Sequence, residues 1–570
     1  MIKNRLSATI EAALRSARAN GDLPIETIPP VSLEMTKSKA HGDWATNVAL
    51  ALAPSLRMTP HAVAKIIVQH IAVNDDLIAG AQVAGPGFIN LTLHPRWLAE
   101  MLQTIENAGD TFGHSTEHSG KKVLVEFVSA NPNGPITLGH GRNAAIGDVL
   151  ASLFAAVGFT VQREHYVNDA LNSTQMNNFG RSVIYRYKQV LGQTVPPEEE
   201  FEWLYRGDYV TDIARAIVAR SGDKYADVDM NDPETVVLFR DLAQEGMLAE
   251  QQSDLAAFGV QFDSYFNEST LHDDGSVARA IEELQERGHT YLKDGALWFR
   301  TTEYGDDKDR VLLRENGTPT YIAGDLAYHK NKFDRGFDRC VDVWGADHAG
   351  YIARTKAAVS ALGYDAQKLD IVLYQLVKIL KNGEFVTSSK RKGDVLCLKA
   401  DLIDEIGKDA ARFYFLVRSP NTDIDIDIDL AKKTDKENPV YYVQYAHARI
   451  IQTLDKARDL GDDLTGLTAR ADLSLLTLDG ESDLVKKLSE YPDEVRISAH
   501  EYAPHRLVQY ARDLAATFHS YYDAGNRNAG LRVVCEDART REARLALINT
   551  TRIVLKNVLS LLGISAPERM

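Results

Sequence analysis

One segment constrains the fold of this chain more than any other: a short apolar run, a loop rich in Asn, Pro and Gly, and then a helical pattern. Residues 123–127 read Val-Leu-Val-Glu-Phe, which is typical of a buried strand, and the pattern that begins near Gly139 has helical periodicity. Strand-like runs return at 296–299, 341–344 and 371–374. This order predicts an α/β unit whose sheet is split by an insertion at about 175–290.

The remainder of the chain divides around this unit. A length of 570 residues exceeds the size at which one hydrophobic core stops growing, so several structural units are expected. Residues 1–110 mix helical patterns with short extended runs, and beyond about 437 strand signals give way to long amphipathic segments. We therefore predict a Rossmann-type parallel sheet with insertions at 111–436, preceded by an α+β domain at 1–110 and followed by an all-α helical bundle at 437–570.

Composition and charge exclude several classes of protein. No apolar run approaches the roughly 18 residues that a membrane-spanning helix needs, and residues 1–19 favour an ordinary amphipathic helix over an organellar presequence. The cysteines Cys340, Cys397 and Cys535 lack a Cys-x-x-Cys spacing, so we expect reduced thiols, a cytoplasmic protein and no structural metal. A net charge of -16 argues against indiscriminate binding to nucleic acid, so any RNA contact must be local.

The loop between the first strand and its helix has the features of a phosphate site. Gly139 and His140 stand where the helix begins. Free backbone N–H groups and the positive end of the helix dipole favour an anion there, and His140 could donate to phosphate oxygens. Taken alone, a Gly-His pair is more often a structural histidine with satisfied hydrogen bonds.

A second candidate loop lies at 387–393 and reads Thr-Ser-Ser-Lys-Arg-Lys-Gly. It follows a strand-like run and precedes a helical pattern. Its consecutive cations, with Lys390 or Arg391 nearest, could stabilise negative charge that develops on a phosphoryl group. Taken alone, an exposed basic turn is the more common explanation.

Together the two loops resemble the two signatures of class I aminoacyl-tRNA synthetases, the His-x-Gly-His motif and the Lys-Met-Ser-Lys-Ser loop. Their order fits, and about 250 residues separate them. Further segments resemble the arginyl-tRNA synthetases in particular, namely 125–132, 166–169, 344–348, 438–449 and 566–570. This many matches in the family's order make coincidence very improbable.

Two positions depart from the family pattern. Thr137 stands where the family has the first histidine, and residues 387–388 replace the usual Lys-Met. Threonine keeps a hydroxyl donor but cannot carry charge. We therefore expect most phosphate stabilisation from His140 and Lys390, with Thr137 and Arg391 as further members of the catalytic set.

The resemblance implies an arginine–tRNA ligase that acts in translation. L-arginine would react with ATP to give arginyl-adenylate and pyrophosphate, and the arginyl group would then pass to the 3′-terminal ribose of tRNA(Arg). The family further implies that Mg²⁺ accompanies ATP, that tRNA is bound before arginine is activated, and that the protein is a monomer.

The same resemblance carries residue roles onto matching positions. The positions that it implies for arginine are Glu126, Asn131, Tyr321 and Asp325. The positions that it implies for ATP are Gly139, His140, Asn143, Gly345, Asp347, His348 and Lys390. The positions predicted to contact tRNA are Phe88 and Asn90, on the D-loop, and Tyr441 and Tyr445, near the anticodon stem and loop.

Other interpretations stay open at the level of sequence. A nucleotidylyltransferase would make adenylates without tRNA, although the helical C-terminal unit disfavours it. A binding protein could have lost catalysis through Thr137, although His140 and Lys390 argue against that loss. Asp325 could instead cap the helix that follows it, and Phe88 could fill a core.

Overall fold

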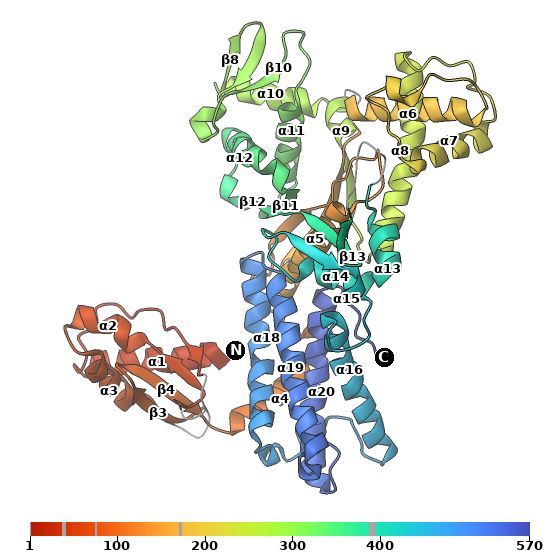
Figure 1. The fold of residues 1–570 in the computed structure, drawn as a ribbon. Coiled ribbons are helices and arrows are strands. Elements are labelled where there is room, and N and C mark those ends of the chain that lie inside the picture. Colours follow the sequence, from red (N-terminus) through yellow and green to blue (C-terminus); the bar gives the residue numbers. More distant parts are fainter. Residues whose placement is uncertain (1, 37–40, 74–76, 170–173, 387–394) are drawn as a thin grey trace.

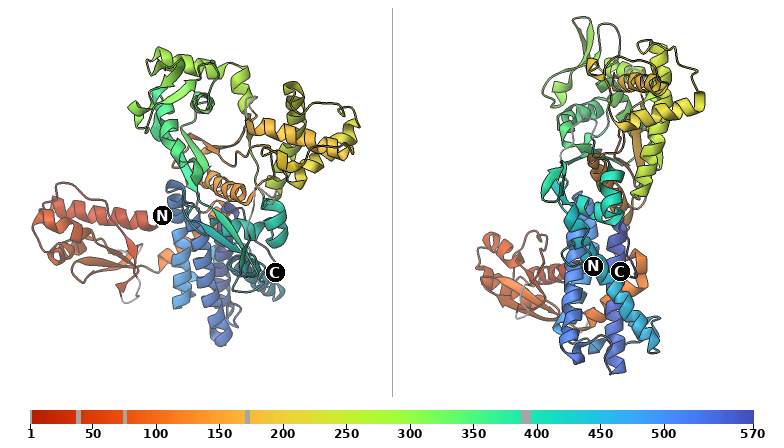
Figure 2. Two further views of the ribbon diagram at one scale, coloured as in Figure 1. Left: turned by 45° about the horizontal axis from the view of Figure 1, so that its top comes forward. Right: turned by 45° about the vertical axis from the view of Figure 1, so that its right-hand side comes forward.

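The computed structural model describes residues 2–36, 41–73, 77–169, 174–386 and 395–570. Figure 1 shows an N-terminal α+β unit beside a long helical bundle, with a central α/β unit at one end of that bundle. Two lobes extend from the central sheet on the side away from the bundle, and the left-hand view of Figure 2 shows them standing apart.

The central sheet has five strands, all parallel, in the order β12-β11-β5-β6-β7. Its strands are β5 Lys122–Glu126, β6 Thr160–Val167, β7 Ser264–Asn267, β11 Arg339–Gly345 and β12 Leu369–Tyr374. Helix α5 (Leu138–Ala156) leads from β5 to β6, while β11 pairs with the opposite side of β5. The strand order therefore reverses between β5 and β11, and open α/β sheets bind ligands at the carboxyl ends of such strands.

The structure corrects two details of the predicted sheet. The run 296–299 forms β9 (Ala296–Phe299), which lies in a separate antiparallel sheet with β8 (Thr290–Lys293) and β10 (Arg310–Leu313). Asp294 and Gly295 both have positive φ, 50° and 74°, so they form the tight turn of a local hairpin that captures this run. The predicted insertion at 175–290 also contains β7, which returns to the parallel sheet.

Each lobe has an apolar cluster of its own. The first lobe is helical and consists of α6 Thr174–Val190, α7 Asp208–Ser221 and α8 Pro233–Ala257. The second lobe packs the β8–β10 sheet against α10 Ser276–Glu286, α11 Tyr321–Asp334 and α12 Ile352–Ala361. The short helix α9 (Glu268–Asp273) follows β7 and contacts α10 and α11.

The N-terminal unit is the predicted α+β module. Its antiparallel sheet has the order β1-β2-β4-β3. The strands are β1 Glu34–Met35, β2 Trp44–Thr46, β3 Ile78–Ala84 and β4 Phe88–Leu93, and the helices are α1 Ile2–Ala19, α2 Val48–Leu56 and α3 Pro60–His70. The expected amphipathic helix is α1, whose residues Leu6, Ile10 and Leu14 are fully buried.

The C-terminal unit is the predicted helical bundle. Its helices are α16 Pro439–Asp459, α17 Leu467–Arg470, α18 Asp479–His500, α19 His505–Arg527 and α20 Ala538–Leu561. Helix α4 (Arg96–Ala108) lies within the predicted N-terminal domain, but it packs against α18 and α20 (Figure 1). Among the residues that the structure describes, no helix is long and apolar enough to cross a membrane.

A further three-stranded sheet and short helices join the sheet to the bundle. The strands are β13 Val377–Lys381, β14 Glu384–Val386 and β15 Ile424–Asp427, and the helices are α13 Asp404–Ile406, α14 Lys408–Leu416 and α15 Ile428–Ala431. Helix α14 packs against α5 on one side and against α16 and α19 on the other. This packing holds the first nucleotide loop in a fixed relation to the bundle.

Candidate active site

The first predicted nucleotide loop ends in a reciprocal cap on α5. Thr137 Oγ1 accepts a hydrogen bond from the His140 backbone N–H, and the Thr137 N–H donates to His140 Nδ1, each at 3.3 Å. Because Nδ1 accepts, the ring proton of a neutral His140 lies on Nε2. The imidazole thus has its N–H donor on Nε2, at the start of a helix that begins at a ligand-binding edge of the sheet.

The segment that follows the second predicted loop is anchored against the first loop. Residues 387–394, which include Lys390 and Arg391, lie outside the described residues. Directly after them, the Leu398 N–H donates to Ile136 O at 2.7 Å, and the Leu138 N–H donates to Leu396 O at 3.2 Å. The chain that emerges from the second loop therefore forms a bridge with the residues that flank Thr137.

Gly141 in α5 allows the segment that contains Leu398 to pack closely against this helix. A Cβ atom added to Gly141 would lie 2.5 Å from Leu398 Cδ1 and 3.1 Å from Phe415. Any larger side chain would displace Leu398, because a Cβ contact under 3.0 Å cannot be accommodated without movement.

The predicted ATP contacts Gly345, Asp347 and His348 lie across the reversal point from His140. Gly345 ends β11, and the side chains of Asp347 and His348 in the next turn are 82% and 55% exposed. A Cβ added to Gly345 would lie 3.6 Å from the Tyr374 hydroxyl, and one added to Gly139 would lie 3.9 Å from the same atom. Tyr374, which the sequence indicated only as part of a strand, thus lies between the two glycine turns.

The buried side chain of Asn143 links the end of β5 to the end of β11. Its side-chain oxygen accepts from the Val128 N–H and its amide donates to Val343 O, both at 2.8 Å. The side chain is 3% exposed, so both ends of the predicted ATP ligand are already committed to the backbone. This geometry suits a residue that positions the β5 and β11 ends.

A strained turn follows β5. Val128 and Ser129 have φ of 66° and 43°, which is rare for residues with a Cβ and rarer still for a β-branched one. The turn lets Ser129 Oγ donate to Glu126 Oε1 at 2.8 Å and accept from the Tyr166 N–H at 3.2 Å. Sequence patterns gave no signal for this turn, which directs the end of β5 toward β6.

The predicted arginine ligand Glu126 takes part in a buried charge network. Its other carboxylate oxygen accepts a hydrogen bond from Lys332 Nζ, which also donates to Asp342 Oδ1 at 2.7 Å. Asp342 in turn contacts His329 Nε2 at 3.0 Å. Burial opposes the charge on Lys332, but Asp342 and Glu126 outweigh it and raise the lysine pKa. Glu126 is therefore already paired with a cation of the protein itself.

The predicted ligand Asp325 stands in a different environment. It lies in the second turn of α11, whose N-cap is Thr320, so the alternative that Asp325 caps this helix is wrong. Burial raises the pKa of Asp325. Among the described residues, no lysine or arginine forms an ion pair with its carboxylate, although the charges of His329 and Arg354 partly offset the effect of burial.

A second carboxylate that sequence reasoning missed lies beside Asp325. A Cβ added to Gly324 would lie 3.2 Å from Glu268 Oε1, and Glu268 is 7% exposed. Burial, together with the charges of Asp325 and Asp169, raises the pKa of Glu268 to about 7, although a hydrogen bond from Tyr166 opposes the shift. Among the described residues, the basic side chain that contacts Glu268 is His272, whose Nε2 lies 3.9 Å from the carboxylate. Such a pair of carboxylates favours a planar cation with several donors.

The other two predicted arginine contacts are Tyr321 and Asn131. Tyr321 is one turn before Asp325 on α11 and is 61% exposed. Asn131 donates from its amide to Gln175 Oε1 of α6 at 2.7 Å. The Asn131 backbone oxygen accepts from Gln251 of α8 at 3.1 Å, so the first lobe holds this loop.

The predicted RNA contacts of the N-terminal unit share one strand face. Phe88, Asn90 and Thr92 alternate on β4 with buried Ile89 and Leu91. Phe88 is 40% exposed, so the alternative that it fills the core is wrong. An exposed ring beside an amide on a strand is suited to stacking on an unpaired base and reading its edge.

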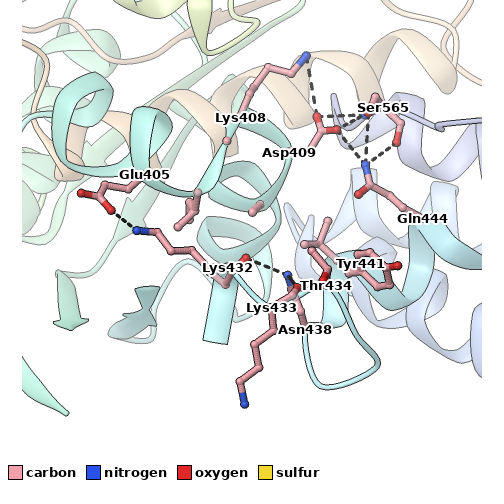
Figure 3. A pocket seen from close by; sticks show the side chains of 15 residues that line it. Glu405, Lys408, Asp409, Lys432, Lys433, Thr434, Asn438, Tyr441, Gln444 and Ser565 are labelled. Carbon is pink, nitrogen blue, oxygen red and sulfur yellow. Dashed lines mark hydrogen bonds and ion pairs between the residues drawn. The ribbon is translucent and has the colours of Figure 1, made fainter. Parts of the chain in front are cut away.

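The two predicted tyrosines of the bundle line different pockets. Tyr441 lines a pocket of about 490 Å³ together with Lys408 at the start of α14 (Figure 3). Tyr445 lines a second pocket of about 480 Å³ with Arg449 and Tyr522. The Arg449 guanidinium carbon lies 4.6 Å from the Tyr445 ring centre and 5.0 Å from that of Tyr522. Arg449 therefore forms an aromatic and cationic surface together with Tyr445 and Tyr522.

Comparison with known proteins agrees with this arrangement along the whole chain. Residues 2–93 match the model of the arginyl tRNA synthetase N terminal domain. Residues 102–446 match the catalytic domain of tRNA synthetases class I (R), and residues 443–570 match the DALR anticodon binding domain.

Individual relatives give the same result. An arginine–tRNA ligase of a Geobacter species is 47% identical over 570 residues, which is 100% of both chains, and one of Desulfitobacterium hafniense is 44% identical over 569 residues, covering 100% of this chain and 99% of the relative. The crystal structure of a putative arginyl-tRNA synthetase from Campylobacter jejuni is 33% identical with a TM-score of 0.75, covering 84% of this chain and 100% of that one. The arginyl-tRNA synthetase of Thermus thermophilus, 22% identical, has the same fold with a TM-score of 0.75 over 100% of both chains. The chain therefore belongs to the arginyl-tRNA synthetase family of class I.

Proposed function

We propose that this chain ligates L-arginine to tRNA(Arg) in two steps. A carboxylate oxygen of arginine attacks the α-phosphorus of ATP, which forms arginyl-adenylate and releases pyrophosphate. A terminal ribose hydroxyl of tRNA then attacks the arginyl carbonyl carbon and AMP leaves. No protein nucleophile takes part, so the residues act by positioning the reactants and by stabilising charge.

The observation that carries this proposal is the pair Asp325 and Glu268. Burial raises the pKa of both carboxyl groups, and no described lysine or arginine forms an ion pair with either, so a guanidinium would favour their charged forms and supply a planar fork of donors. Glu126 remains a ligand candidate, but it already shares Lys332 with Asp342. We therefore assign the guanidinium to Asp325 and Glu268, and assign Glu126, Asn131 and Tyr321 to the rest of the amino acid.

The ATP phosphates would lie between the two loops. His140 Nε2 and the N-terminus of α5 provide donors on one side, and Lys390 and Arg391 provide charge on the other, with Mg²⁺ arriving as part of the ATP substrate. Gly139 and Gly345 leave room for the nucleotide beside Tyr374. Asp347 and His348 would contact the ribose and adenine, and Asn143 would hold the strand ends in place.

Two surfaces would hold the tRNA. Phe88 and Asn90 would take a D-loop base on the exposed face of β4. In the bundle, Tyr441 and Tyr445 would contact the anticodon stem and loop, with Arg449 adding charge to stacking. We further propose a cytoplasmic monomer, in keeping with the widely spaced cysteines and with the family.

Arginine-dependent exchange of labelled pyrophosphate into ATP tests this function directly. We expect exchange with arginine-accepting tRNA and none without it, followed by charging of the tRNA. Exchange that proceeds equally without tRNA would favour the nucleotidylyltransferase. No exchange with tRNA present would leave a binding protein and end the ligase proposal.

A further inference from the structure

A cluster of metal-ligating side chains lies far from the candidate active site, where the segment before β5 meets the end of α18. Glu117 and His118 belong to that segment, and His500 is the last residue of α18. Among the described residues, these are the three whose ligand atoms gather closely enough to hold one metal ion, since all lie within 4.8 Å of one another.

The backbone around Glu117 and His118 is well fixed. The Ser115 N–H donates to Ala156 O at 2.8 Å, and the His118 N–H donates to Val157 O at 3.0 Å. The His118 ring stacks on Phe159 with 4.2 Å between ring centres. The segment is thereby held against the end of α5, so the cluster does not depend on a freely moving loop.

The distances fit a four-coordinate metal. His500 Nε2 lies 3.0 Å from Glu117 Oε1, and His118 Nε2 lies 3.8 Å from the same oxygen. Neighbouring ligand atoms around tetrahedral zinc, with bonds of about 2.0–2.1 Å, are roughly 3.3 Å apart. All three ligand atoms lie within 4.8 Å of one another, so rotations of the partly exposed side chains would bring them to this spacing.

We propose that Glu117, His118 and His500 form a binding site for Zn²⁺ or a similar imidazole-binding divalent cation, with water as the fourth ligand. Two imidazoles and one carboxylate are a recurrent zinc set, whereas Mg²⁺ and Ca²⁺ prefer oxygen ligands. His118 Nδ1 is buried without a hydrogen-bond partner, so no such bond commits the ring tautomer and Nε2 can present its lone pair.

Nearby charges add to this selectivity. Lys121 and Arg339 act electrostatically on His118 and oppose a bound cation. Arg339 is itself paired with Asp370 at 2.5 Å, and Glu117 supplies negative charge within the cluster. A hard cation held by charge alone would gain little here, while a metal that bonds to imidazole nitrogen gains from both rings.

A bound ion would join two parts of the fold. Residues 115–118 lead into β5 of the central sheet, and α18 is a bundle helix that also packs against α5. A metal bond between His118 and His500 would cross-link positions 382 residues apart in the chain. The ion is expected to stabilise the junction between the sheet and the bundle, because it binds the folded state and not the separated ligands.

Calorimetric titration of the full chain, after treatment with a chelator, tests the proposal with ZnCl₂ and, separately, with MgCl₂. We expect saturable Zn²⁺ binding, no matching response to Mg²⁺, and a higher unfolding temperature with Zn²⁺. His118→Ala and His500→Ala should each weaken binding by at least about 100-fold, since even the loss of an outer partner costs 10- to 100-fold. Co²⁺ should give visible absorption bands in the parent chain that both variants lose.

One control variant and one further ligand variant complete the experiment. His61→Ala removes an exposed histidine from α3 and should leave Zn²⁺ binding unchanged. Glu117→Gln changes an exposed side chain with little risk to folding, and it should also weaken binding. Equal Zn²⁺ affinity in the parent chain and in the double variant of His118 and His500, or no Zn²⁺ binding by the parent at about 100 times the protein concentration, would overturn the proposal. Neither result bears on the ligase activity.

Discussion

Thr137 and His140 cap the first turn of α5 reciprocally, with the Thr137 hydroxyl on the His140 N–H and the Thr137 N–H on the His140 ring, each at 3.3 Å. The threonine that departs from the family signature thus binds the His140 backbone through its hydroxyl, while its backbone N–H binds the His140 ring. A hydroxyl residue is well suited to this position, because the N-cap residue must satisfy a free N–H of the helix.

Thr137→Ala should therefore affect both stability and catalysis. Loss of the cap should cost about 1 kcal/mol of unfolding free energy. The bond from the backbone N–H of residue 137 to the His140 ring remains, but the first turn that carries both groups is less fixed, so the rate of arginine-dependent ATP–pyrophosphate exchange should fall by roughly 10-fold, less than the loss of a whole donor. Thr137→Ser keeps the oxygen and should retain most of both. An exchange rate in Thr137→Ala equal to that of the parent would show that the cap does not orient His140.

Lys390→Ala should lower the same exchange rate by roughly 100-fold or more, which is the scale for losing one donor to the transition state. Exchange kinetics at saturating arginine and tRNA measure this effect. Lys436→Ala is a matched control, because this exposed lysine lies outside the candidate site. Equal rates for the parent and Lys390→Ala would remove Lys390 from the mechanism.

Glu268 should make arginine use depend on pH. Its pKa of about 7 means that the carboxylate ionises as the pH rises through neutrality, while the guanidinium stays charged. The KM for arginine should therefore fall between pH 6 and pH 8. Glu268→Gln should raise this KM and remove most of its pH dependence, whereas Asp273→Asn, at an exposed position on the same helix, should not.

The same raised pKa has a consequence for stability without substrate. The folded state keeps the Glu268 proton above the usual pKa of 4.5, so it binds more protons than the unfolded state between that value and about 7. The contribution of Glu268 to unfolding free energy should then decrease as the pH rises through this window. A flat difference in melting temperature between parent and Glu268→Gln from pH 5 to pH 8 would contradict the shifted pKa.

Lys332→Met should destabilise the chain by about 3–5 kcal/mol, because it leaves Glu126 and Asp342 buried without their shared cation. Urea unfolding of the full chain measures the change. Lys330→Met is the matched control on the same helix, where a partly exposed pair with Asp334 should contribute about 1 kcal/mol or less. Equal unfolding midpoints for the two variants would mean that the buried network contributes no more than the surface pair.

Phe88→Ala should raise the KM for tRNA in aminoacylation by about 5-fold or more, given the roughly 1–3 kcal/mol that stacking contributes per base. The fold should be preserved, because the ring is 40% exposed and its removal leaves no core cavity. Thr92→Ala changes the same strand face and is the matched control. Unaltered tRNA kinetics in Phe88→Ala would exclude stacking on this ring.

Local patterns along the chain were enough to predict the elements whose residues are close in sequence. The apolar run of β5, the loop and the helical period of α5 lie within about 35 residues, so their neighbours in the chain are also their neighbours in space. The same holds for the alternation on β4, which predicted the shared face of Phe88 and Asn90. The order of the motifs along the chain was sufficient to predict the family.

Contacts between groups that are distant in the chain followed only from the packing of whole elements. The run 296–299 has the composition of a strand in the central sheet, but the turn at Asp294 and Gly295 pairs it with β8 instead. The apolar content of a run does not distinguish these two pairings. Glu268 acquires its raised pKa because burial brings it beside Asp325, 57 residues later in the chain. Glu117 and His118 meet His500 only when the bundle packs against the sheet. Such contacts depend on the packing free energy of whole elements, whereas strand and helix periods depend on neighbouring residues alone.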